Sequence, residues 1–143
     1  MENVHASVVL TVKTKIYAPI ETVWDALTNT KHIQQWNFAH ESWHCPKAVN
    51  KLAVGGMFSY RMEAKDGSAG FDLEGKFDKI EAPSELEYTL ADGRKVKVSL
   101  EPTTKSRILV VQSFEAEESN SLEDQQKGWQ STLDNLNAYA QNL

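Results

Sequence analysis

The sequence contains a single cysteine, Cys45, so no disulfide bond can form within the chain. Its first residues, Met-Glu-Asn-Val-His, lack the basic start and the apolar run of a signal peptide. No apolar stretch approaches the roughly 20 residues that a membrane-spanning helix needs, because charged or polar residues interrupt every candidate. These absences exclude a disulfide-built fold and a membrane span, and they favour a cytoplasmic protein.

Positive charge is also scarce. Lys and Arg number 15 against 20 Asp and Glu, which gives a formal net charge of -5. Such a chain does not attract phosphate backbones, so we expect no nucleic-acid partner. The sequence holds no phosphate-binding glycine loop, G-x-S-x-G elbow, C-x-x-C pair or dinucleotide fingerprint. Nucleotide and serine-hydrolase chemistry therefore have no support, and we expect no cofactor.

What is present is an ordinary globular composition. Hydrophobic residues make up 41% of the 143 residues and charged residues 24%. This length is enough for one domain with its own core. We expect a single domain over residues 1–143, with the choice between monomer and homodimer left open.

The first third of the chain predicts one strand and two short helices. Residues 8–17 alternate between apolar and polar side chains, which favours a strand that ends at Pro19. Ile20, Val23, Trp24 and Leu27 then recur at helical spacing, with Trp24 expected in the core. A second short helix follows over residues 30–36. Residues 37–54, which include a proline, are expected to form a loop.

Five further strands are predicted from residue 55 onward, separated by turn residues such as Asp66-Gly67 and Asp92-Gly93. In each strand one parity is apolar, and in the middle strands the other parity is charged or polar, as in an antiparallel sheet with one solvated face. The inward positions are Phe58, Tyr60, Met62, Phe71, Leu73, Phe77, Leu86, Tyr88, Leu90, Val96, Val98, Leu100, Ile108, Val110 and Phe114.

One long helix is predicted at the end of the chain, with Ser121 as its N-cap. Its apolar stripe consists of Leu122, Trp129, Leu133, Leu136, Ala140 and Leu143. This stripe would cover the apolar face of the sheet, and the order of elements indicates an α+β fold. Gly128 lies inside the helix. Either a strand or ligand approaches the backbone closely there and requires a glycine, or the helix simply tolerates one.

Several motifs resemble the START-like (SRPBCC, Bet v 1-like) superfamily: Ala-Pro-Ile-Glu-Thr-Val-Trp-Asp-Ala-Leu-Thr from residue 18 and Gln-Gln-Trp at 34–36. More specific are Gly-Gly-Met-Phe-Ser-Tyr-Arg-Met at 55–62, Phe-Asp-Leu-Glu-Gly at 71–75, and residues 88–94 and 126–136. These resemble the branch related to the C-terminal domain of the activator of heat shock protein 90 ATPase. The similarity covers about residues 8–143. It implies a helix-grip fold, in which a curved antiparallel sheet, here of six strands, wraps the long C-terminal helix and leaves a cavity.

The resemblance and the inward aromatic residues predict a binding domain for a small apolar or lipid-like ligand. The alternatives are a chaperone-interacting module of the heat shock protein 90 activator type, and a cavity-based cyclase or hydrolase. We assign no catalytic residue. Trp129 fits either the cavity or the core, and the tyrosine hydroxyls could orient a ligand or meet water. The residues expected to line the cavity are Trp36, Trp43, Phe58, Tyr60, Met62, Phe71, Leu73, Tyr88, Trp129 and Leu133.

Residues 40–44, His-Glu-Ser-Trp-His, match the H-E-x-x-H zinc motif in letters. That motif requires a helix, yet Pro46 follows two residues later and no third ligand is evident. We therefore assign no metal ligand, and place His40 and His44 as polar groups at the cavity entrance. Cys45, beside His44, is expected to be an inert thiol.

Overall fold

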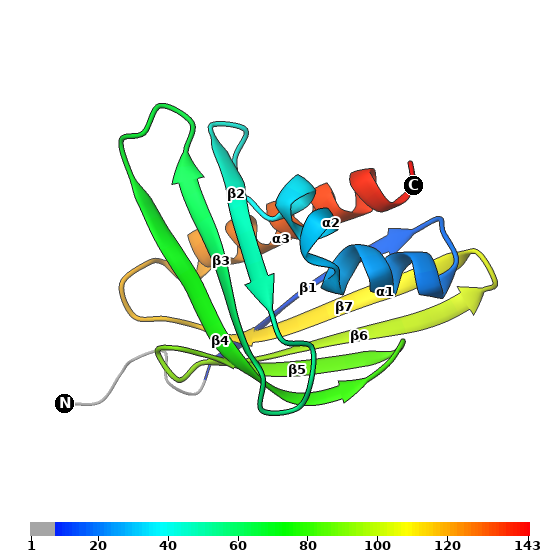
Figure 1. Cartoon of the computed structure of the whole chain (residues 1–143). Coiled ribbons are helices and arrows are strands. Elements are labelled where there is room, and N and C mark those ends of the chain that lie inside the picture. The colour runs from blue at the N-terminus through cyan, green and yellow to red at the C-terminus, as the bar shows by residue number, and fades with distance from the viewer. Residues whose placement is uncertain (1–7) are drawn as a thin grey trace.

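The computed structural model describes residues 8–143 as one curved sheet with three helices (Figure 1). All neighbouring strands are antiparallel, in the order β1-β7-β6-β5-β4-β3-β2. The elements are β1 (Val9–Ile16), α1 (Ile20–Thr28), α2 (Thr30–Trp36), β2 (Trp43–Asn50), β3 (Met57–Ala64), β4 (Gly70–Glu81), β5 (Glu85–Leu90), β6 (Lys95–Thr104), β7 (Arg107–Glu115) and α3 (Leu122–Ala140).

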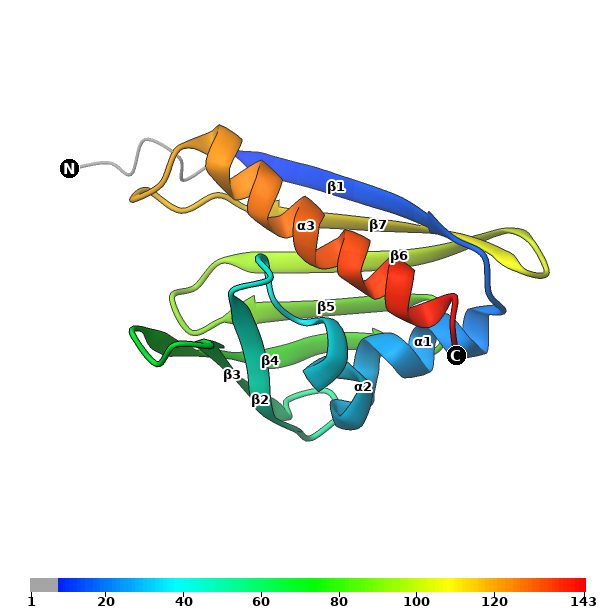
Figure 2. The same ribbon diagram turned by 90° about the horizontal axis from the view of Figure 1, so that it is seen from above.

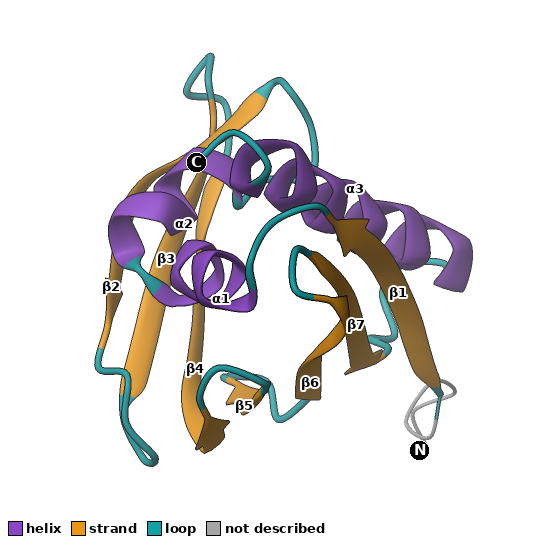
Figure 3. Ribbon diagram, turned by 90° about the vertical axis from the view of Figure 1, so that its right-hand side faces the viewer, coloured by secondary structure: helices purple, strands orange, loops and turns teal. Residues whose placement is uncertain are grey.

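The sheet curls, and the helices lie on its concave side (Figure 3). The long helix α3 runs beside β1 and across the sheet (Figure 2). The predicted α+β helix-grip architecture is therefore confirmed, including the two short helices after the first strand. In the part of the chain that the structure describes, no helix is long and apolar enough to cross a membrane.

The number of strands differs from the sequence prediction. The sheet has seven strands, because residues 43–50 of the expected loop form β2 at one edge. Pro46 argues against a strand in the sequence pattern, because proline lacks a backbone N–H. An edge strand tolerates a proline, however, since one row of its backbone N–H groups needs no partner. The register against β3 also shifts between His44 and Lys47, which interrupts the alternation of side chains.

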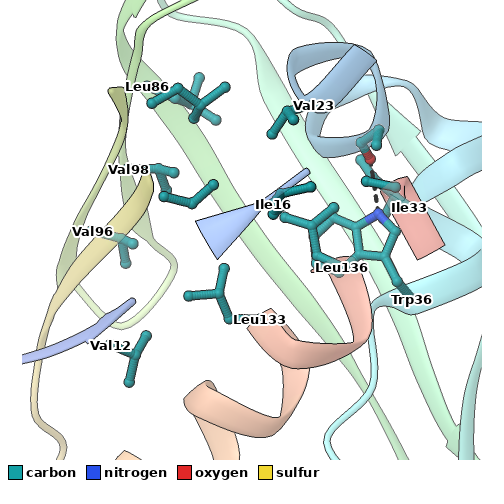
Figure 4. Close-up of a cluster of buried hydrophobic side chains, with 14 of the residues drawn as sticks. Val12, Ile16, Val23, Ile33, Trp36, Leu86, Val96, Val98, Leu133 and Leu136 are labelled. Carbon is teal, nitrogen blue, oxygen red and sulfur yellow. Dashed lines mark hydrogen bonds between the residues drawn. The ribbon is translucent and has the colours of Figure 1, made fainter. Parts of the chain in front are cut away.

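Helices α1 and α2 form a small unit that closes one end of the curved sheet. The side chain of Asn29 caps α2 by accepting a hydrogen bond from the backbone N–H of Lys31 at 3.0 Å. The indole N–H of Trp36 donates to the carbonyl oxygen of Ala26 at 2.8 Å, which ties α2 to α1 (Figure 4). The core into which this contact packs includes Val12, Ile16, Val23, Ile33, Leu86, Val96, Val98, Leu133 and Leu136.

Helix α3 begins where the sequence predicted. The Ser121 hydroxyl accepts a hydrogen bond from the backbone N–H of Asp124 at 3.0 Å. The helix ends at Ala140, so Leu143 lies beyond it and is exposed rather than part of the inner stripe.

Three side-chain amides of α3 bind the open edge of β1, and a fourth, at the helix C-cap, binds the residue that follows the strand; we call these four the amide ladder. The ladder residues are Gln126, Gln130, Asn137 and Gln141. The first three donate to the carbonyl oxygens of Thr11 (2.8 Å), Lys13 (3.0 Å) and Lys15 (3.0 Å), and the last accepts from the N–H of Tyr17 at 3.2 Å. Alternate backbone groups of β1 thus meet amides on one face of the helix, and this fixes the position of α3 against the strand.

Candidate ligand pocket

A pocket of about 520 Å³ lies between the middle strands of the sheet and helices α2 and α3. Every residue that the sequence placed at the cavity wall lines it, except Trp43. These residues are Trp36, Phe58, Tyr60, Met62, Phe71, Leu73, Tyr88, Trp129 and Leu133. Phe71 lies at the outer part of the wall, since 50% of its surface is exposed.

The sheet side of the pocket is built around the ring of Phe58 on β3. Its centroid lies 4.8 Å from the ring of Tyr60, 5.2 Å from that of Phe77 and 5.1 Å from that of Tyr88. Gly75, opposite Phe58 in the β3–β4 pair, makes room for this ring: a Cβ at position 75 would come within 2.5 Å of it. Glycine at this position therefore leaves room for the Phe58 ring close to the β4 backbone.

The helix side of the pocket is formed by α3. The ring of Trp129 stacks on that of Phe114 in β7, and Leu133 lies one turn further along the helix. A Cβ at Gly128 would meet no atom of the described residues within 4 Å. Close approach to a strand is thus excluded as the reason for this glycine, which instead leaves space at the pocket wall.

Two tyrosine hydroxyls provide polar groups in the pocket wall. The hydroxyl of Tyr60 accepts a hydrogen bond from Nδ2 of Asn50 at 3.2 Å. That of Tyr88 lies 3.5 Å from Nε2 of Gln112, a long contact. Burial raises the pKa of Tyr60 to about 12 and raises the pKa of Tyr88 still further, so both are neutral phenols at physiological pH.

The polar end of the pocket contains residues that the sequence analysis did not identify. Nε of Arg94 donates to a carboxylate oxygen of Asp92 at 2.8 Å. The buried amide of Gln125 donates to the carbonyl oxygens of Glu117 and Asn120 at 3.1 and 2.9 Å. Neither residue belongs to an apolar stripe, so periodicity alone carries no signal for it. The wall residues not named in the sequence prediction also include Leu27, Ile33, Asn37, Gln112, Asp124 and Thr132.

Residues 40–44 are not among the residues that line the pocket. They form a turn that leads into β2, so the two histidines of the H-E-x-x-H letters do not share a helix face. His40 is exposed, and Nε2 of His44 lies 3.9 Å from a carboxylate oxygen of Glu63. Within residues 8–143, no group of three or more His, Cys, Asp or Glu side chains is placed to hold a metal ion.

The neighbouring Trp43 and Cys45 are likewise not among the residues that line the pocket. The ring of Trp43 packs near Phe71, with centroids 6.0 Å apart. Cys45 is buried, and burial raises the pKa of its thiol to about 11. At neutral pH the nucleophilic thiolate is therefore suppressed.

The comparisons with known proteins show the family and the fold of the chain. The family model described as "Activator of Hsp90 ATPase homolog 1-like protein" matches residues 17–141. The chain belongs to the AHSA1-like family. No curated protein matches it at a significant level.

Solved structures of AHSA1-like and related bacterial proteins share the fold. The AHSA1-like protein from Aeromonas hydrophila is 38% identical, with a TM-score of 0.84 and 93% of each chain covered. Chr148 from Cytophaga hutchinsonii is 42% identical, with a TM-score of 0.79 and coverage of 92% of this chain and 91% of the other. NE0264 from Nitrosomonas europaea has a TM-score of 0.80 at 19% identity, with 94% of each chain covered, and so shares the fold alone.

Proposed function

We propose that this AHSA1-like protein binds a small apolar molecule in the pocket between the sheet and α3. The observation that carries the proposal is the pocket itself: its volume of about 520 Å³ lies within the range of small-molecule sites. Most of the residues that line it are aromatic or aliphatic and a minority are polar, as is typical of such sites. The cytoplasmic location expected from the sequence is part of this proposal.

The aromatic walls favour a flat ligand. Phe58 and Tyr60 line the pocket from the sheet, and Trp129 lines it from the helix. Aromatic rings bury much apolar area and prefer stacked or edge-on contacts with other rings. A fused-ring or otherwise planar apolar molecule would make both kinds of contact.

Binding is better supported than catalysis. The pocket groups with a shifted pKa are Tyr60 and Tyr88, and both shifts are upward. Neither tyrosine is therefore poised to accept a proton near neutral pH, where a general base needs its pKa.

The direct test is a titration with N-phenyl-1-naphthylamine, a neutral apolar dye that becomes fluorescent in an apolar site. We expect the wild-type protein to bind the dye, with energy transfer from Trp129. Gly128→Leu directs a side chain into the open space at the pocket wall and should weaken binding at least about tenfold, a loss of about 1.4 kcal/mol.

The matched control is Lys127→Leu, which places the same side chain on the exposed surface one residue away. It should bind the dye like the wild type. Far-ultraviolet circular dichroism and thermal unfolding establish that both variants fold. Absence of dye binding by the wild type, or equal binding by Gly128→Leu, would contradict the proposal.

A second candidate function is suggested by the family description, which names an activator of the Hsp90 ATPase. In this function the partner is a chaperone and the pocket is not required. The test is the ATPase rate of an Hsp90-type chaperone with and without the protein, using Gly128→Leu in parallel. Stimulation that Gly128→Leu leaves unchanged would favour this second function.

A further inference from the structure

The hydrogen-bonding role of the Tyr60 hydroxyl is set by a neighbouring amide. Nδ2 of Asn50 lies 2.9 Å from the carbonyl oxygen of Thr28 and 3.2 Å from the Tyr60 hydroxyl. A backbone carbonyl only accepts hydrogen bonds, so the atom that faces it must be the amide nitrogen. The same nitrogen therefore donates to Tyr60, and the oxygen of Tyr60 is the acceptor in this pair.

The hydrogen of the Tyr60 hydroxyl is consequently free to point elsewhere. Among residues 8–143, Tyr60 donates no hydrogen bond. Its side chain lines the pocket, and the burial that raises its pKa to about 12 keeps the hydrogen in place at physiological pH. Tyr60 is half-buried, and a bound molecule that displaces water from the pocket would leave this donor without an acceptor unless the molecule supplies one.

The charges around the pocket indicate what kind of acceptor fits. The one cationic side chain among the lining residues is Arg94, and its Nε is already bonded to Asp92 at 2.8 Å. The other charged lining residues are the acidic Glu117 and Asp124. The lining residues thus carry more negative than positive charge, so the wall disfavours an anionic ligand such as a carboxylate, whereas a neutral oxygen acceptor meets no such repulsion.

We propose that Tyr60 donates a hydrogen bond to a neutral acceptor oxygen of the ligand, such as a carbonyl oxygen, and that the pocket thereby selects apolar carbonyl compounds over hydrocarbons of the same shape. This inference rests on the proposed binding function and names the class of ligand. Tyr60 is then a specificity-determining residue. Phe58, which stacks on its ring at 4.8 Å, supplies apolar contact without distinguishing the two classes.

The test compares two probes of similar shape, 2-acetylnaphthalene and 2-ethylnaphthalene, by displacement of N-phenyl-1-naphthylamine. The quantity of interest is the ratio of their dissociation constants, because it cancels the apolar contacts that both probes make. Tyr60→Phe should shift this ratio against the ketone by about three- to tenfold, the size of one neutral hydrogen bond. The control is Tyr139→Phe. The hydroxyl of Tyr139 forms a hydrogen bond with His32, and Tyr139 does not line the pocket, so this variant should leave the ratio unchanged.

A second variant and a spectroscopic readout separate hydrogen bonding from packing. Asn50→Asp replaces the donor that faces Tyr60 with an acceptor. The hydroxyl hydrogen of Tyr60 should then turn toward this carboxylate instead of the ligand. The preference for the ketone should therefore fall even though Tyr60 is still present. With a carbon-13 label in the carbonyl group, the bound ketone should show a lowered stretching frequency in the wild type and a higher one in Tyr60→Phe.

The outcomes distinguish this inference from the proposed function. If the wild type binds both probes, and Tyr60→Phe changes neither the ratio nor the carbonyl frequency, the role of Tyr60 is overturned while the binding function stands. If the wild type binds neither probe nor the dye, both proposals fail. Circular dichroism of each variant confirms that it is folded.

Discussion

The ring of Trp129 lies flat against the ring of Phe114, with the two centroids 4.1 Å apart and the planes 8° apart. Phe114 is fully buried in β7, whereas Trp129 belongs to α3 and also lines the pocket. The same indole therefore holds the helix to the sheet and forms part of the ligand wall. Stability and ligand binding are thus coupled at this residue.

Replacing Trp129 tests this coupling. We expect Trp129→Ala to lower the free energy of unfolding by about 2–4 kcal/mol, because it removes a large stacked side chain, and to weaken dye binding. Urea denaturation measures the first effect and dye titration the second. Trp43→Ala, outside the pocket wall, should cost less than half as much, and an equal loss in the two variants would contradict the prediction.

Two glycines should respond to alanine in opposite directions. Gly128→Ala adds a methyl group in open space within a helix, so it should stabilise the protein by up to about 1 kcal/mol. Gly75→Ala places a methyl group within 2.5 Å of the Phe58 ring and 2.7 Å of the Thr89 carbonyl oxygen, so it should destabilise by about 1–3 kcal/mol. Thermal unfolding of both variants checks the signs, and the same sign in both would contradict this assignment.

The amide ladder should contribute measurably to the docking of α3. Removal of two donors in Gln126→Ala/Gln130→Ala should lower the free energy of unfolding by about 1–2 kcal/mol. Lys127→Ala serves as the control, since Lys127 is exposed on the same helix and pairs with the exposed Glu123. Hydrogen exchange at β1 should rise in the double variant alone. Unchanged exchange there would show that the ladder does not hold the strand.

Alkaline pH should weaken the fold partly through Cys45. Its thiol has a pKa of about 11 in the folded protein against an ordinary value of 9.0, so the folded state holds its proton more tightly than the unfolded state. The stabilisation is complete below the ordinary pKa and is lost as pH rises toward the folded value. Cys45→Ala should make the decline in unfolding free energy over this range shallower, as measured by urea titration at several pH values. An identical decline would show that the thiol does not contribute.

The elements that could be predicted are those whose side chains follow a simple period. Alternation in β3, β4 and β5 placed Phe58, Leu73 and Tyr88 on the inner face, and the same residues line the pocket. The strand β2 was missed because Pro46 and the register shift break its alternation, and pairing with β3 supplies what the local pattern lacks. Trp43 was assigned to the cavity on the assumption that its segment was a loop.

The polar contacts could not be predicted, because they join positions far apart in the sequence. The amides of Gln126 and Gln130 meet backbone carbonyl oxygens of β1, and a backbone acceptor leaves no trace in composition. The orientation of Asn50 toward Tyr60 depends likewise on the carbonyl of Thr28, at the end of α1. Such contacts follow from the curvature of the sheet, which periodicity does not specify.

The two outer strands have a further consequence for how this protein meets other molecules. Along β1 the amide ladder already occupies carbonyl groups that an added strand would need, and in β2 Pro46 lacks the N–H that such a strand would bind. Neither edge strand offers the continuous row of unpaired N–H and C=O groups with which a strand of another molecule pairs in aggregates. Extension of the sheet is therefore disfavoured at both edges relative to self-association through side-chain surfaces.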